Sequence, residues 1–281
     1  MSDANSAAEA DRALKTKHRK MWALGDYPAI ANELIPELGP VLVRACGIGS
    51  GQRVLDVAAG TGNAAIPAAL AGAHVVASDL TPELLEAGRQ AAEKQGIELE
   101  WREADAEALP FGDDEFDTVM SCVGVMFAPH HQATADELLR VCRPGGTIGL
   151  INWTPEGFIG RMFATMKPYA PPPPPGAQPP PLWGQEQHLQ ALFADRVTDV
   201  EVVRQTVRVD RFESPEAFRD YFKANYGPTI ATYRNIAEDP DRVAALDREL
   251  AALARQAGDT DETAPAAMDW EYLLFTARTR G

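Results

Sequence analysis

The sequence predicts an α/β fold built on a mostly parallel sheet of seven strands, for three reasons. Short apolar runs alternate with helical patterns from residue 53 to residue 152. This alternation favours parallel strands, right-handed crossovers and helices on both faces of the sheet. Residues 54–63 read as a strand and a two-glycine loop before a helix-compatible stretch, which opens a Rossmann-like unit. The 281 residues, 45% of them hydrophobic, suffice for its core.

The chain is expected to begin with a disordered segment followed by helices. Residues 1–12 are small, polar and acidic, with little apolar surface to bury, which predicts disorder. Residues 28–46 carry apolar side chains at helical spacing, which predicts a helix or a helix pair before the sheet, broken by Pro36 and Pro40. The basic cluster at residues 15–20 is expected to be a solvated helix face.

Five strands are predicted in the first half of the chain. They cover residues 53–57, 74–78, 97–101, 116–121 and 147–152. Between the second and third strands, Thr81, Pro82 and Glu83 supply an N-cap, a first-turn proline and a first-turn acid. A further helix is expected at 136–142.

The second half is predicted to add a stiff loop, two strands and a helical cap. Nine of the fourteen residues from 168 to 181 are proline, which favours an extended segment. A rigid loop beside the ligand cleft is favoured there over a partner-binding segment. Residues 197–209 and 270–277 are the sixth and seventh strands. The helical residues between them make a cap over one end of the sheet, at 213–262.

Charge and composition exclude several partners. The formal net charge of −15 and the pI near 4.8 repel phosphate backbones and anionic membrane surfaces, so no nucleic-acid or membrane partner is expected. The three cysteines show no metal-ligand spacing and no disulfide pattern, and no metal is expected. The sequence has neither an apolar signal core nor a membrane-length apolar run, which predicts a cytoplasmic protein.

The candidate ligand site lies at the carboxyl ends of the strands, where open parallel sheets bind ligands. Four groups fall there: Asp56 with Ala58, Gly60, Thr61, Gly62 and Asn63; Asp79 with Leu80; Asp105 with Ala106; and Ser121 with Cys122 and Val123. Asp56 would repel a pyrophosphate and attract an ammonium or sulfonium. S-adenosylmethionine carries both cations and no phosphate. Asp79 can accept hydrogen bonds from both hydroxyl groups of a ribose, and Asp105 can accept a hydrogen bond from an exocyclic amine.

Taken in order, five stretches resemble the class I S-adenosylmethionine-dependent methyltransferases, in particular the group similar to the ubiquinone and menaquinone C-methyltransferases. The stretches are 54–63, 75–80, 103–110, 116–123 and 138–146. The resemblance makes residues 48–281 the methyltransferase domain. It implies that the last strand is antiparallel and lies between strands five and six.

The resemblance also assigns roles to residues. Gly60 and Gly62 let the backbone approach the methionine part of the cofactor, Asp79 holds the ribose and Asp105 holds the adenine. Residues 22–27 are similar to a segment that folds over the cofactor, so Trp22 and Tyr27 join the site and 13–47 becomes a cofactor cover. The expected product is S-adenosylhomocysteine.

Methyl transfer is an in-line displacement in which the protein mainly positions and desolvates the acceptor. If a general base is needed, His130 and His131 are the candidates, although a solvent-facing position at a helix start is favoured for them. Cys122 follows a serine and is interpreted as cleft lining. Aromatic residues in and near the cap predict a small apolar or aromatic acceptor, as part of small-molecule metabolism.

Two other classes remain open at the level of sequence. One is a nicotinamide-dependent oxidoreductase, against which Asp56 and the incomplete Gly-X-Gly-X-X-Gly pattern count. The other is a non-catalytic Rossmann-like module that binds a partner through residues 168–181. The sequence leaves open the acceptor, the methylated atom (oxygen, nitrogen or carbon) and the oligomeric state, a homodimer included.

Overall fold

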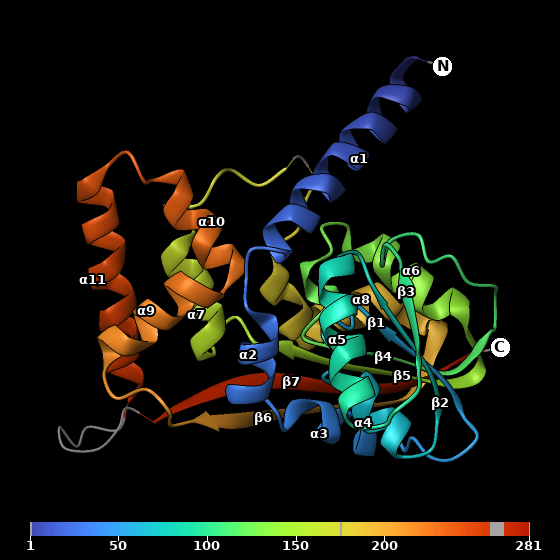
Figure 1. The fold of residues 1–281 in the computed structure, drawn as a ribbon. Helices are drawn as coiled ribbons and strands as arrows, with labels where there is room; N and C mark the ends of the chain where they lie inside the picture. Colours follow the sequence, from blue (N-terminus) through green and yellow to red (C-terminus); the bar gives the residue numbers. More distant parts are fainter. Residues whose placement is uncertain (1, 175, 259–266, 281) are drawn as a thin grey trace.

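The computed structural model describes residues 2–174, 176–258 and 267–280, and contains a single sheet of seven strands in those ranges (Figure 1). The strands are β1 (Arg53–Val57), β2 (His74–Asp79), β3 (Glu100–Glu103), β4 (Phe116–Cys122), β5 (Cys142–Trp153), β6 (Val197–Val209) and β7 (Met268–Thr279). Their order is β3-β2-β1-β4-β5-β7-β6. Strands β1 to β5 pair in parallel, and β7 pairs antiparallel with both β5 and β6. The predicted fold, with its inserted antiparallel last strand, is confirmed.

Two strands depart from their predicted bounds. Strand β3 begins three residues later than expected, at Glu100, and pairs only with β2. Because β3 is an edge strand, it does not need apolar side chains on both faces. Its charged residues therefore do not form the apolar run from which a strand is predicted. Strand β5 begins at Cys142, because pairing with Phe116 continues across a register shift through the predicted turn at 143–146.

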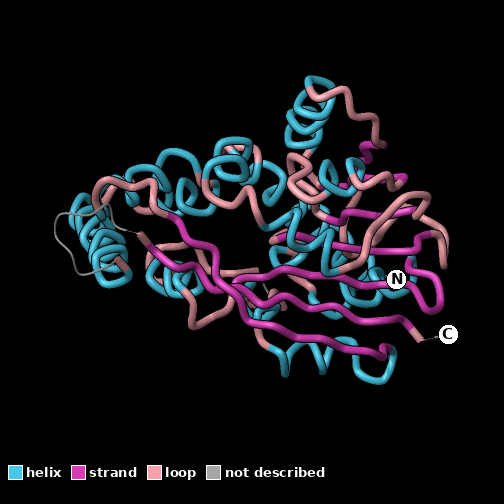
Figure 2. The backbone as a smooth tube through the Cα atoms, turned by 90° about the horizontal axis from the view of Figure 1, so that it is seen from below, coloured by secondary structure: helices cyan, strands magenta, loops and turns pink. Residues whose placement is uncertain are grey.

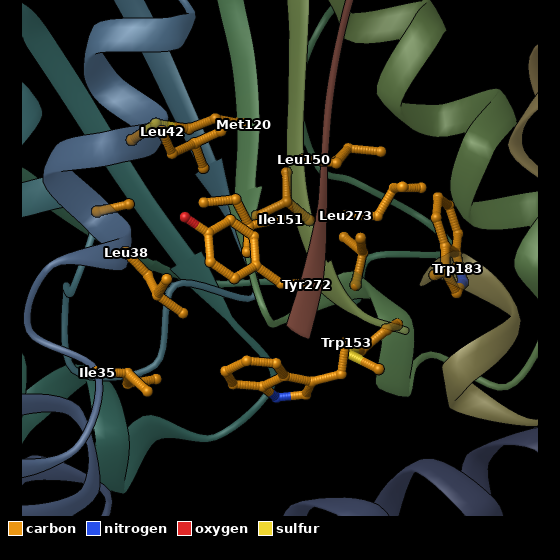
Figure 3. Packing of buried hydrophobic residues seen from close by; sticks show 14 of the residues in the cluster. Ile35, Leu38, Leu42, Met120, Leu150, Ile151, Trp153, Trp183, Tyr272 and Leu273 are labelled. Carbon is orange, nitrogen blue, oxygen red and sulfur yellow. The ribbon is translucent and has the colours of Figure 1, made fainter. Parts of the chain in front are cut away.

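Helices cover both faces of the sheet (Figures 1 and 2). They are α3 (Leu38–Ala45), α4 (Ala65–Leu70), α5 (Pro82–Lys94), α6 (His131–Val141) and α8 (Glu186–Phe193). In the core, the neighbouring residues Tyr272 and Leu273 of β7 point to opposite faces (Figure 3). Tyr272 points toward Leu38 of α3, and Leu273 points toward Trp183 of the 3-10 turn η2 (Pro180–Gly184).

The N-terminal segment is helical where disorder was predicted. Helix α1 spans Ser2–Trp22, so residues 2–12 continue the helix that contains Lys15. Alanine and the long charged side chains of this stretch have high helix propensity. Its second half is anchored, because Lys15 and Arg19 pair with acids at 103–107. The helix α2 (Tyr27–Glu33) follows and is capped by Asp26, whose carboxylate accepts a hydrogen bond from the amide of Ala29.

The cap is a cluster of four helices at the end of the sheet that β6 and β7 reach (Figure 1). They are α7 (Phe158–Met166), α9 (Pro215–Asn225), α10 (Gly227–Asn235) and α11 (Pro240–Ala257). Three of them come from the predicted insertion, whereas α7 comes from the connection between β5 and β6. Side chains of Ser214 and Asp239 cap α9 and α11. Residues 259–262 of the predicted cap lie outside the described residues.

The proline-rich stretch leads from α7 to η2 and is attached at both ends. Near its start, the Tyr169 hydroxyl donates to Glu249 of α11 over 2.7 Å. Near its end, the Gln178 amide donates to the carbonyl oxygen of Pro129 over 3.0 Å. The stretch therefore spans from the cap to the loop after β4. In the described part of the chain, no helix combines the length and apolarity that crossing a membrane requires.

Candidate functional site

A cavity lies where the carboxyl ends of the parallel strands meet α1, α2 and the cap. On the side of β2 and β3 its lining is polar and includes Lys15, His18, Asp79 and Asp105. On the side of β5, β7 and the cap the lining is apolar. It comprises Ile35, Phe127, Trp153, Ile159, Met162, Phe222, Tyr226 and Trp270. Strand order thus divides the cavity into a polar half and an apolar half.

The loops after β1 and β4 meet at the middle of this cavity. Ala58 and Val123, one from each loop, have φ of 55° and 53°, a strained region for residues other than glycine. Between them the backbones approach so closely that a Cβ on Gly124 would lie 2.4 Å from the carbonyl oxygen of Ala58. Gly60 also has positive φ, at 56°, and space around its Cα is open. The strain indicates that tertiary contacts hold both loops in a fixed position.

Asp79 connects β2 to the glycine loop. One carboxylate oxygen accepts from the amide of Gly60 and the other from the amide of Thr81, each over 2.8 Å. Burial raises the pKa of Asp79, while the hydrogen bonds from Thr81 and Gly60 act to lower it. Thr81 occupies the N-cap position of α5, as predicted, but its side chain accepts no capping hydrogen bond from the first turn.

Asp56 lies beneath the loop and is 1% exposed. Neither of its carboxylate oxygens accepts a hydrogen bond of ordinary geometry from the described residues, and burial raises its pKa to about 8 against a weaker opposing effect of the Ala65 amide. It does not line the cavity. Gly62 and Ser121 do not line it either: Gly62 turns the loop with φ of 86°, and the Ser121 hydroxyl accepts from the amide of Val125.

The remaining predicted cofactor residues do line the cavity. They are Trp22, Tyr27, Ala58, Gly60, Thr61, Asn63, Asp79, Leu80, Asp105, Ala106, Cys122 and Val123. Burial raises the pKa of the Cys122 thiol far above its ordinary value, which keeps it a neutral lining group.

The structure places neither histidine ring in the cavity. His131 is fully buried, with Nδ1 2.9 Å from Nε2 of His188 and its ring against Trp183. Burial, and then His188, lower the pKa of His131 to about 4. His130 instead turns to Glu107, with 2.9 Å between Nδ1 and Oε2. The His131 ring lies against His188 of α8, and neither histidine lines the cavity, so nothing in this geometry supports a general base and that role stays a prediction.

Sequence reasoning missed Lys15, which is buried at the polar half. Its ammonium contacts Asp105 over 2.9 Å and also Glu107. The basic cluster at residues 15–20 is therefore not simply a solvated face. The available signal was the spacing of Lys15, His18 and Trp22, which places all three on one side of α1, and all three line the cavity.

The segment 13–47, predicted to cover the cofactor, meets the cap at one junction. The Asp26 amide donates to the carbonyl oxygen of Asn225 over 2.9 Å, and the Gly227 amide donates to the Tyr27 hydroxyl over 3.1 Å. The ring centroid of Trp22 lies 5.4 Å from that of Tyr27. Residues of α1, α2 and α9, with Tyr226 between α9 and α10, thus line the cavity next to this junction.

Comparison with known proteins is consistent with this site. A family model described as a methyltransferase domain matches residues 54–146, which contain the glycine loop and three of the acids. The "Uncharacterized protein Rv1403c" of Mycobacterium tuberculosis is 56% identical over 263 residues, 94% of each chain. The demethylmenaquinone methyltransferase of Clavibacter sepedonicus is 44% identical over 105 residues, 37% of this chain and 42% of that protein.

A solved structure shares the fold. It is the phosphoethanolamine N-methyltransferase 2 of Haemonchus contortus, in complex with phosphomonomethylethanolamine and S-adenosylhomocysteine. The TM-score is 0.53 at 16% sequence identity, covering 87% of this chain and 53% of that one.

Proposed function

Since the chain belongs to the class I S-adenosylmethionine-dependent methyltransferases, we propose that it methylates a small apolar or aromatic metabolite bound beneath the cap. The observation that carries the proposal is the composition of the apolar half. Its lining comes from α7, α9, β5 and β7, and includes Trp153, Met162, Phe222 and Trp270. Among the described residues lining that half, none carries an ionised side chain. An apolar lining of this kind selects for apolar ligands.

The polar half fits the cofactor. Asp79, held by two backbone amides, presents a fixed carboxylate for the ribose hydroxyls, and Asp105 can accept from the adenine amine. Asp56 is buried beneath the loop with a raised pKa, so a cationic ligand above the loop would favour its ionised form and be stabilised by it in turn. S-adenosylmethionine supplies the reactive methyl group and the cationic sulfur when it is bound.

This chain contributes orientation and exclusion of water. The loops after β1 and β4 fix the floor of the cavity, while Trp22, Tyr27 and Tyr226 close it from above. Burial raises the pKa of Tyr226 far above its ordinary value, so its hydroxyl stays protonated and can donate a hydrogen bond to the acceptor. Without an ionised base in this half, we propose that the acceptor brings its own nucleophilic atom.

The test uses the full chain and has two steps. Calorimetry should show one site for S-adenosylhomocysteine and no heat of binding with NADH. Incubation with metabolite extracts and isotopically labelled methyl donor should then label an apolar or aromatic product, identified by mass spectrometry. Label found only in charged, phosphate-bearing products would overturn the proposed acceptor class, whereas absence of S-adenosylhomocysteine binding would overturn the cofactor site.

A further inference from the structure

Lys15 of α1 is buried against two acids that follow β3. Its side chain is 11% exposed and that of Glu107 is 8% exposed. Lysine is almost never buried to this degree unless it is paired, and an unpaired buried charge is strongly destabilising. Nζ of Lys15 meets Oδ1 of Asp105 over 2.9 Å and also contacts Oε2 of Glu107. The lysine therefore joins the N-terminal helix to the residue expected to bind adenine.

The two oxygens of Asp105 are not equivalent. Oδ1 accepts from Lys15 and from the backbone amide of Glu107, the latter over 3.0 Å. Oδ2 receives no hydrogen bond from the residues that the structure describes. Glu107 is held in turn by His130, whose amide and Nδ1 lie 2.7 Å and 2.9 Å from its carboxylate oxygens. These contacts fix the plane of the Asp105 carboxylate and leave one oxygen available.

The surroundings of Lys15 are acidic. The carboxylates of Asp11 and Glu107 and the ring of His130 lie within 4.8 Å of one another. Without the ammonium, Asp105, Glu107 and Asp11 would repel one another, and Asp105 would be free to turn toward water. Arg19 makes a second tie from α1, to Glu103 over 2.7 Å, but its side chain is 40% exposed and contributes less.

We propose that Lys15 is a positioning residue that makes adenine recognition depend on the docking of α1. By holding Oδ1 of Asp105, the ammonium directs Oδ2 to accept from the 6-amino group of the cofactor. The inference rests on the proposed placement of adenine at Asp105. It assigns to the N-terminal helix a part in selecting the base, in addition to covering the cavity.

A thermodynamic cycle between ligand and protein tests the proposal. Calorimetry measures the dissociation constants of S-adenosylhomocysteine and of its analogue with hydrogen in place of the 6-amino group. The proteins are wild type, Lys15→Met, Lys15→Arg and Lys17→Met. Lys17→Met is the matched control, since it removes the same charge from an exposed position on the same helix.

In wild type, Lys15→Arg and Lys17→Met, the 6-amino group should strengthen binding about tenfold, as a hydrogen bond to a charged group does. In Lys15→Met that factor should fall to about threefold or less, since the acceptor oxygen is no longer oriented. An unchanged factor in Lys15→Met overturns the proposal, whether both ligands bind as in wild type or both weaken equally. Wild-type binding of S-adenosylhomocysteine tests the cofactor site separately, so the two failures are distinguishable. Should Lys15→Met fail to fold, Lys15→Gln replaces it with the same expected outcomes.

Discussion

At the scale of single residues, Asp56 is a buried acid that opposes folding. Its oxygens accept no hydrogen bond of ordinary geometry among the described residues, and burial, opposed only weakly by the Ala65 amide, raises its pKa from 3.8 to about 8. Between pH 3.8 and about pH 8, the Asp56 side chain is protonated in the folded state and ionised in the unfolded state. The free energy of unfolding that Asp56 contributes therefore falls as pH rises from about 4 to 8. The cationic cofactor proposed to bind above the loop would favour the ionised form of Asp56, and this is the reason we propose for keeping a residue that opposes folding.

We expect Asp56→Asn to stabilise the cofactor-free protein and to weaken binding of S-adenosylmethionine. The gain in the free energy of unfolding should be at least about 1.4 kcal/mol at pH 8, the equivalent of one pKa unit, and should shrink toward pH 5. Thermal unfolding at several pH values and calorimetry measure the two effects. The exposed Asp195→Asn is the control, with no pH-dependent gain expected. An equal gain at pH 5 and pH 8 would show that Asp56 is ionised throughout this range.

At the scale of elements, the junction between α9 and α10 joins the cover to the cap. It depends on Gly227, where a Cβ would lie 2.5 Å from the carbonyl oxygen of Met21 and 2.6 Å from the Tyr27 hydroxyl. No larger residue fits unless α1 or α2 moves. The close approach also lets the Gly227 amide reach Tyr27, whose ring lines the cavity.

Replacement of Gly227 by alanine should displace Tyr27. Overpacking of this kind costs about 1–3 kcal/mol of stability, and we expect S-adenosylhomocysteine to bind roughly tenfold more weakly, as 1.4 kcal/mol of lost binding energy would produce. Denaturant unfolding and calorimetry provide the two values. Gly49→Ala is the control, because a Cβ there meets no heavy atom within 4 Å. Wild-type affinity in Gly227→Ala would mean that the junction does not support the cofactor cover.

At the scale of the whole molecule, the cavity is closed by segments that are far apart in the sequence. Residues after β1, β2 and β4 form its floor, while residues of α1, α2 and α9, with Tyr226 between α9 and α10, form its cover. The cover binds to the cap through the Asp26 and Gly227 amides, and the ring centroid of Trp22 lies 4.6 Å from that of Phe127 after β4. A ligand that restricts the motion of any one of these segments should therefore restrict the motion of the others as well.

Hydrogen exchange should show this coupling directly. Saturation with S-adenosylhomocysteine is expected to slow amide exchange at 54–80 and, at the same time, at 21–35 and 215–235. Strand β6 serves as an internal control, since no residue of it lines the cavity. Protection confined to 54–80 would contradict the coupling between cover and cap.

The strand and helix pattern follows from the sequence because it depends on local periodicity. Buried strands such as β1 need apolar runs, and the glycine loop needs residues that tolerate positive φ, so both are visible in a linear reading. The same holds for the acids at strand ends, since the carboxyl ends of parallel strands always meet at one edge.

Only the tertiary structure decided what surrounds those acids. Lys15 lies 90 residues from Asp105 in sequence, and its cluster reads as an ordinary solvated helix face until α1 docks. The rings of His130 and His131 turn toward Glu107 and His188 because of where α6 begins. Side-chain direction depends on packing between elements that sequence periodicity does not encode, whereas the order of buried strand, glycine loop and helix follows from the local pattern.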